Sequence, residues 1–168
     1  MNTSVAVLMG GWSSEREVSL VSGGAIIDAL AETPFDARAI DVQRDVASLV
    51  AELTPAPDVV LNALHGRYGE DGCIQGILEC LGLQYTHSGV LASALAMDKP
   101  MAKKLFESVG IPCAPHIIAA RTDFRAGKVM DKPFVIKPIN EGSSFGVTVV
   151  LDHNNLASPA HTSWALGD

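Results

Sequence analysis

The first residues suited to binding chemistry lie in the run Gly10-Gly11-Trp12-Ser13-Ser14-Glu15, which follows a short apolar segment. Glycines let the backbone turn sharply and approach a ligand, and the N–H groups that open a helix favour anions. A carboxylate at this place would repel a phosphate, so Glu15 suits a cationic group such as the ammonium of an amino acid. Position alone supports equally well a structural role in which Glu15 caps the helix, as Ser14 or Glu17 could.

A second candidate is the run His65-Gly66-Arg67-Tyr68-Gly69-Glu70-Asp71-Gly72, which follows an apolar segment and precedes a predicted helix. Three glycines in eight residues are more than a plain turn requires. Histidine can donate a hydrogen bond to a carboxylate or a phosphate, so we predict a ligand-binding role for His65. Glu70 and Asp71 are interpreted as structural, because acidic residues at a helix start stabilise its dipole.

A third candidate begins at Lys137, near the end of an apolar strand that is followed by the loop 139–146 with Gly142, Ser143 and Ser144. Backbone N–H groups and hydroxyls of such a loop can close over nucleotide phosphates. A lysine inside a sheet is costly without an anionic partner, although an exposed hairpin lysine is the alternative. The loop is not a Walker A motif, which reads G-x-x-x-x-G-K-S/T. Lys99 is a second, weaker cation that alone would be an ordinary surface lysine.

Alternating elements are predicted to position the first two runs. Apolar segments predict strands at residues 4–9, 35–41 and 58–64, with helices from residue 17, at 46–53 and at 74–81. In the first helix, apolar residues recur at helical spacing: Val18, Val21, Ala25, Ile26, Ala29 and Leu30. Strands that alternate with helices favour a doubly wound α/β fold with a parallel sheet, because parallel neighbours need a crossover.

The pattern changes near residue 98, where we place the start of a second unit. A helix from Pro100 is expected to carry Met101, Leu105 and Val109 inward and to end at Gly110-Ile111-Pro112. Strands are predicted at residues 116–120, 134–138 and 147–151, and the last two are expected to form a hairpin.

Composition limits the function classes. The chain has 168 residues, 48% of them hydrophobic, and a formal net charge of −7. So large an apolar fraction argues against disorder, and the absence of a Lys/Arg run argues against nucleic acid or an anionic membrane as partner. No apolar run reaches the roughly 18 residues that span a bilayer, and Met1-Asn2-Thr3-Ser4 lacks a basic signal-peptide region, so we predict a cytoplasmic protein.

Three cysteines, Cys73, Cys80 and Cys113, form no C-x-x-C pair and have no histidine at metal-ligand spacing. No metal site is therefore predicted from them. Cys73 and Cys80 lie seven residues apart on a predicted helix, so we expect both to share a face as reduced, packed side chains.

Taken in order, GGWSSEREVS, HGRYGEDGCIQG, MDK and KPINEGSSFGV closely resemble the D-alanine:D-alanine ligases of the ATP-grasp superfamily. The match runs from about residue 4 to 151, and HGRYGEDGCIQG fits the family signature at every constrained position. The resemblance implies ATP-dependent amide-bond formation between two D-alanines for peptidoglycan. ATP would phosphorylate the carboxylate of the first D-alanine, and the amine of the second would attack the acyl phosphate.

The resemblance also implies residue roles. Glu15 would hold the ammonium of the first D-alanine, and His65 would lie beside its carboxylate. Ser143 would hydrogen-bond near Glu15 and orient the reactants. Lys99 and Lys137 would contact the ATP phosphates, and the 142–146 loop, with Gly142 and Ser144, would cover them. This interpretation requires Glu15, Lys99 and Lys137 to converge on one cleft.

By this resemblance, residues 1–97 would be an α/β substrate-binding domain, and residues 98–168 the first, incomplete part of an ATP-grasp domain. Family members continue into a region that supplies the Mg²⁺ ligands and selects the second substrate. We therefore expect the 168-residue chain to be inactive alone and the complete protein to be a homodimer. One alternative is a non-catalytic remnant with residual D-alanine binding. The other is a dinucleotide-binding oxidoreductase using Asp41, although the first run is not G-x-G-x-x-G.

Overall fold

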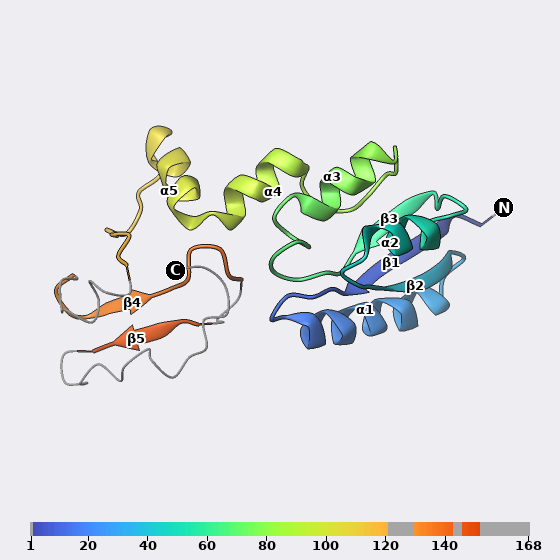
Figure 1. Cartoon of the computed structure of the whole chain (residues 1–168), viewed down its shortest axis with the longest axis horizontal. Coiled ribbons are helices and arrows are strands. Elements are labelled where there is room, and N and C mark those ends of the chain that lie inside the picture. The colour runs from blue at the N-terminus through green and yellow to red at the C-terminus, as the bar shows by residue number, and fades with distance from the viewer. Residues whose placement is uncertain (1, 121–129, 143–145, 152–168) are drawn as a thin grey trace. The chain divides into compact units, whose positions relative to one another are not determined.

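The computed structural model describes residues 2–120, 130–142 and 146–151 of the chain (Figure 1). The chain forms two compact units, Met1–Met97 and Asp98–Asp168. Their assignment as a substrate-binding domain and an incomplete ATP-grasp domain stays a prediction.

A three-stranded parallel sheet forms the centre of the first unit. Its strands are β1 (Ser4–Gly10), β2 (Asp36–Val42) and β3 (Val59–Asn62), in the order β2-β1-β3. Val5 lies opposite Ala37 on one side and Val59 on the other. The edge beyond β3 is extended by a parallel bridge between Val60 and Tyr85. The predicted parallel sheet is therefore confirmed.

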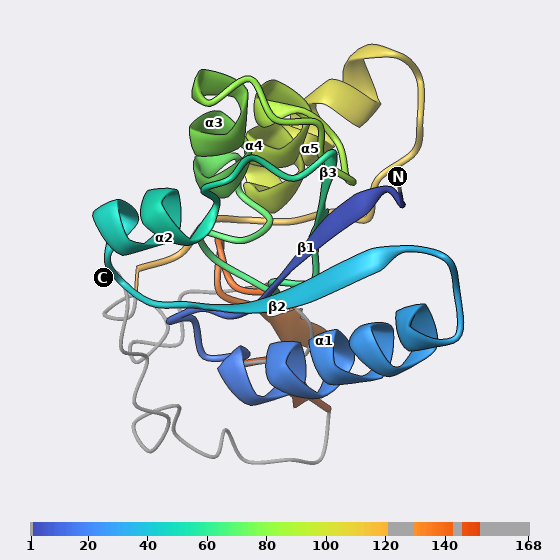
Figure 2. The ribbon, with the colours of Figure 1, turned by 90° about the vertical axis from the view of Figure 1, so that its right-hand side faces the viewer.

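Helices cover both faces of this sheet. Helix α1 (Arg16–Ala31) lies on one face, while α2 (Val46–Glu52) and α3 (Cys73–Cys80) lie on the other (Figures 1 and 2). Successive residues of β1 point to opposite faces and so serve two separate cores. The core on the α1 face contains Val5, Val7, Met9 and Ala63, and the other contains Ala6, Leu8, Ile40, Val42, Leu49, Leu53, Val60, Leu64, Ile74 and Leu78. The predicted doubly wound arrangement is confirmed.

Helix α1 buries a different face from the apolar one that its sequence suggested. Val18 and Val21 are 54% and 74% exposed, whereas Ser19 and Gly23 are buried. A Cβ on Gly23 would lie 2.5 Å from the Cβ of Met9. The absence of a side chain at Gly23 therefore lets α1 lie close to β1. Of the predicted apolar stripe, Ile26 and Leu30 do pack against the sheet, but Ala25 and Ala29 are exposed.

Helices α3 and α4 agree with the sequence prediction in one respect and differ from it in two. Helix α3 ends before Gly82, which adopts φ +69° as its sequence predicted. Cys73 and Cys80 are exposed, because Ile74 and Leu78 take the buried face of α3. Helix α4 (Val90–Met97) was not predicted, since its sequence VLASALAM has almost no polar residue to mark a period.

In the second unit, α5 (Lys99–Ser108) begins after Asp98, whose carboxylate accepts a hydrogen bond of 2.9 Å from the Met101 N–H. Gly110 ends it with φ +80°. The expected inward face was wrong, because Met101, Leu105 and Val109 are 41%, 44% and 72% exposed. No element among the described residues of this unit covers them.

A short antiparallel pair completes the described part of the second unit. Strands β4 (Phe134–Ile136) and β5 (Thr148–Val150) pair with Phe134 opposite Val150, which confirms the predicted hairpin pairing. Residues 116–120 form no strand, contrary to prediction. Ile117 and Ile118 in this segment are 53% and 66% exposed, and no described strand pairs with it.

Candidate functional site

The first two candidate runs lie at the same edge of the parallel sheet. Strands β1 and β3 are neighbours, and the chain leaves β1 into α1 on one face and β3 towards α3 on the other. Such a reversal point opens a crevice beyond the carboxyl ends of the strands, where ligands of open α/β sheets bind. The segments that follow Gly10 and Asn62 both start at this edge.

Ser13 joins the two segments. Its hydroxyl donates a 2.7 Å hydrogen bond to the carbonyl of His65 and accepts one of 3.1 Å from the N–H of Glu15. A Cβ on Gly66 would lie 2.5 Å from Oε2 of Glu15. The Glu15 carboxylate therefore lies against the backbone of the second segment, and the structure brings the Glu15 and His65 segments together.

Glu15 occupies the position just before α1, but its side chain makes no capping hydrogen bond to the helix. It is 9% exposed. The capping alternative for this side chain is therefore wrong. The side chain is instead buried against the backbone at Gly66, at the edge of the sheet where β1 and β3 end.

The second segment is held by its own acidic residues. Glu70 accepts a 2.6 Å hydrogen bond from the N–H of Gly66, and Asp71 accepts one of 3.2 Å from the N–H of Cys73 at the start of α3. These contacts agree with the structural roles that we expected for both residues. The half-buried His65 has its ring Nε2 3.2 Å from Oγ of Ser22 on α1.

Two buried amide side chains, those of Asn62 and Gln75, anchor the same segment. Sequence reasoning missed both of them. Asn62 and Gln75 are 2% and 1% exposed, and their side-chain N–H groups donate to the carbonyl of Gly69 at 2.8 and 2.9 Å. Asn62 also accepts a 3.1 Å hydrogen bond from the N–H of Leu64. The available signal was an amide side chain at the end of an apolar strand and another within an apolar helix face.

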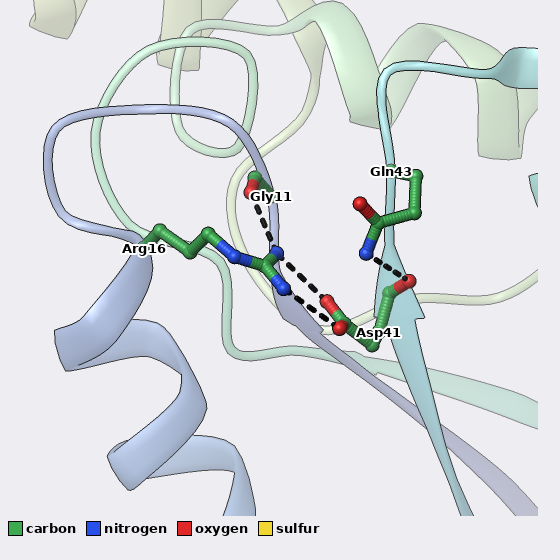
Figure 3. Close-up of polar contacts among 4 residues, drawn as sticks. All are labelled: Gly11, Arg16, Asp41 and Gln43. Carbon is green, nitrogen blue, oxygen red and sulfur yellow. Dashed lines mark hydrogen bonds and ion pairs between the residues drawn. The ribbon is translucent and has the colours of Figure 1, made fainter.

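An ion pair fixes the first segment at its other side (Figure 3). The Arg16 guanidinium donates to both carboxylate oxygens of Asp41, at 2.8 and 2.7 Å, and to the carbonyl of Gly11 at 2.8 Å. The hydrogen bond with Asp41 raises the pKa of Arg16 above its ordinary value. Because Asp41 is occupied by Arg16, it is poorly placed to bind a ribose, which weakens the oxidoreductase alternative.

The lysines Lys99 and Lys137 lie in the second unit. Nζ of Lys99 donates to the carbonyls of Ile139 and Glu141, at 3.1 and 2.6 Å. Burial lowers the pKa of Lys99, and the positive charge of Lys137 lowers it further. The two cations are therefore close enough to repel each other, an arrangement suited to an anion with several charges.

Lys137 itself is exposed, so the argument that its burial demands an anion was wrong. Its neighbouring strand is only three residues long and leaves the side chain open to solvent. Gly142 is half-buried and directly follows Glu141, one of the two residues whose carbonyls hold Lys99. Ser143 and Ser144 lie outside the described residues.

Across residues 2–120, 130–142 and 146–151, no three or more His, Cys, Asp or Glu side chains gather closely enough to hold a metal ion. None of the helices in that part of the chain is long and apolar enough to cross a membrane.

Comparison with known proteins identifies relatives of this chain. The family model described as D-ala D-ala ligase N-terminus matches residues 46–88. The D-alanine–D-alanine ligase of Rhodospirillum rubrum is 52% identical over 168 residues, which cover 99% of this chain and 56% of that protein. D-alanine–D-alanine ligase B of Mesorhizobium japonicum is 54% identical over 166 residues, which cover 98% of this chain and 53% of that protein.

Solved structures of ligases have the same fold. D-alanine–D-alanine ligase from Bacillus anthracis has a TM-score of 0.71 at 34% identity, and the match covers 88% of this chain and 48% of that one. The same enzyme complexed with ATP gives a TM-score of 0.68 at 32% identity, covering 90% and 51%. The chain spans about half the length of the relatives it matches. The resemblance to the D-alanine–D-alanine ligases that the sequence indicated is thereby confirmed, over about half the length of those proteins.

Proposed function

We propose that this chain supplies the first-substrate site and part of the ATP site of an ATP-dependent D-alanine–D-alanine ligase. The observation that carries the proposal is the buried Glu15 carboxylate, which lies against the backbone at Gly66 while Ser13 holds the carbonyl of His65. In this role Glu15 binds the ammonium of the first D-alanine, and His65 donates to its carboxylate. A site with one anion and one hydrogen-bond donor of this kind matches the two charged ends of an amino acid.

The reaction places ATP against the same amino acid. A carboxylate oxygen of the first D-alanine attacks the γ-phosphorus, and ADP leaves. The amine of the second D-alanine then attacks the resulting carbonyl carbon, loses a proton and expels phosphate. Lys99 and Lys137 neutralise phosphate charge, and Gly142, Ser143 and Ser144 close over the phosphates. Such catalysis depends on positioning and charge neutralisation.

Several parts of the proposal concern the complete protein. In that protein Glu15 and Ser143 take the catalytic positioning roles. The protein acts in the cytoplasm, as a homodimer, on D-alanine and ATP, with neither nucleic acid nor a membrane as partner. Mg²⁺ would neutralise phosphate charge, but the described residues contain no cluster of His, Cys, Asp or Glu side chains that would hold it.

Binding of the first substrate can be tested on the 168-residue chain. We expect D-alanine to shift the NMR signals of the Glu15 and His65 segments, and Glu15→Gln to abolish these shifts because it removes the charge that pairs with the ammonium. Glu17→Gln is the matched control, since Glu17 lies two residues away and is exposed. Equal D-alanine binding by wild type and Glu15→Gln would contradict the assigned role.

Catalysis requires a complete chain. A chimaera can join this chain to the remaining part of the 52% identical Rhodospirillum rubrum ligase. We expect D-alanine-dependent phosphate release from ATP by the chimaera and none by the 168-residue chain alone. A folded chimaera that binds ATP but releases no phosphate with D-alanine would favour the remnant alternative.

A further inference from the structure

We propose that Ser22 is a positioning residue for His65. Its hydroxyl donates to Nε2 of the His65 ring and thereby leaves Nδ1–H as the ring donor for a substrate carboxylate. This inference rests on the proposed function, because it deepens the role given to His65 in binding the first D-alanine.

Three serines of the first segment and α1 bind one short stretch of chain after β3. Ser13 donates to the carbonyl of His65 at 2.7 Å, and Ser19, which is fully buried, donates to the carbonyl of Ala63 at 2.7 Å. Both of these contacts hold backbone. Among the described residues, Ser22 alone hydrogen-bonds to the His65 ring, at 3.2 Å.

The spacing of these residues places them on one face of α1. Glu15, Ser19 and Ser22 are separated by four and three residues, the intervals that align side chains along a helix. Ser19 anchors the backbone and Ser22 the imidazole from one face of α1, and Glu15, proposed to bind the ammonium, precedes the helix on the same side. This polar face is also the one that turns inward, in place of the face with Val18 and Val21.

The hydrogen-bond roles follow from the chemistry of a neutral imidazole, in which one nitrogen donates and the other accepts. A carboxylate ligand can only accept, so the nitrogen facing it must carry the proton. With Nε2 engaged by Ser22, that proton belongs on Nδ1, and the hydroxyl of Ser22 must then donate. Without Ser22, the ring is free to exchange between its two tautomers and to rotate away.

The tautomer can be measured without any ligand. In ¹H–¹⁵N NMR spectra of the 168-residue chain at about pH 8.5, where a histidine is ordinarily neutral, we expect His65 to be the Nδ1–H form. Ser22→Ala should convert the signal to an exchanging mixture, and Ser22→Thr should preserve the Nδ1–H form. The spectrum of His65→Gln assigns the signal among the five histidines of the chain.

Ser19→Ala is the matched control, because it is the same change on the same helix beside the same stretch of chain. It removes the donor to a buried carbonyl, so it should lower the melting temperature while the His65 tautomer stays as in wild type. Ser22→Ala should fold, since alanine is a better helix former than serine. An Nδ1–H signal that survives Ser22→Ala, or an Nε2–H signal in wild type, would overturn the inference.

A D-alanine titration then separates this inference from the proposed function. We expect Ser22→Ala to weaken D-alanine binding about 2- to 10-fold, the effect of one net hydrogen bond, and Ser22→Thr to restore it. If wild type fails to bind D-alanine, the proposed function is contradicted, whereas the tautomer measurement still decides the role of Ser22. If wild type binds and Ser22→Ala binds equally, the positioning role is contradicted alone.

Discussion

Arg16 and Asp41 form a two-point ion pair that joins the start of α1 to the end of β2 (Figure 3). The same guanidinium holds the carbonyl of Gly11, whose φ of +76° follows the +79° of Gly10. A Cβ on Gly10 would collide with Oδ1 of Asp41. The turn before Glu15 is thus shaped by two glycines and closed by this pair.

The first prediction concerns this pair. Asp41→Asn should lower the free energy of unfolding slightly, because the two side chains are 32% and 46% exposed and salt screens them. Arg16→Met should lower it more, since it also removes the hydrogen bond to Gly11. Urea unfolding at low and high salt measures both effects. Asp36→Asn, at the other end of β2, is the control, and an unchanged salt dependence in Asp41→Asn would contradict the prediction.

The second prediction compares two glycines with the same backbone strain. Gly66 and Gly82 have φ of +70° and +69°, so alanine at either should cost about 1–2 kcal/mol of stability. A Cβ at Gly66 would lie 2.5 Å from Oε2 of Glu15, whereas a Cβ at Gly82 would meet nothing within 4 Å. We expect only Gly66→Ala to abolish D-alanine binding, measured by NMR titration. Equal binding by both variants would place the ligand elsewhere.

The third prediction concerns stability in acid. Two hydrogen bonds from Ser4 lower the pKa of Asp58 below its ordinary value of 3.8. The bond from the backbone N–H has the larger effect and the bond from the hydroxyl the smaller. A folded-state pKa below the unfolded value means that this contribution is complete above about pH 3.8 and is lost as pH falls through the folded pKa. Ser4→Ala should therefore shift acid unfolding to higher pH. Circular dichroism measures the midpoint, with Ser48→Ala as control, and an unmoved midpoint would contradict the prediction.

The fourth prediction concerns the lysines. Burial and the charge of Lys137 lower the pKa of Lys99, so Lys137→Gln should raise it. NMR titration of ¹³C-methylated lysines measures this change. Lys103→Gln is the control, because Lys103 donates to the carbonyl of Ala114 and does not perturb Lys99. In wild type the pKa of Lys99 is lower in the folded state than the ordinary 10.5 of the unfolded chain. The free energy of unfolding should therefore rise as pH increases from the folded pKa towards 10.5. An unchanged Lys99 pKa in Lys137→Gln would contradict the assigned proximity.

Much of the fold could be predicted because it depends on local signals. The run before Gly10 predicts β1, and Gly82 predicts the end of α3. The sequence assigned Glu15 and His65 to one substrate only through the family resemblance. Their meeting agrees with a general rule about parallel strands, whose carboxyl ends share one edge.

The remaining features depend on packing that a periodic pattern does not contain. The buried face of α1 was mistaken because Ser19 and Gly23 let the helix approach the sheet more closely than Val18 or Val21 would. Helix α4 was missed because it has no polar face. The amides of Asn62 and Gln75 could be assigned only once Gly69 was known to lie between them. The convergence of Glu15 with Lys99 and Lys137 stays a prediction.

Gly23 has no functional group, yet it governs how closely α1 approaches β1. Any larger side chain there would press against Met9 and push α1 away from β1, and Glu15, the residue just before α1, would move with the helix. D-alanine affinity should thus depend on Gly23, a residue of the helix–sheet packing, because the absence of a Cβ there sets the distance between α1 and β1 and so the position of Glu15.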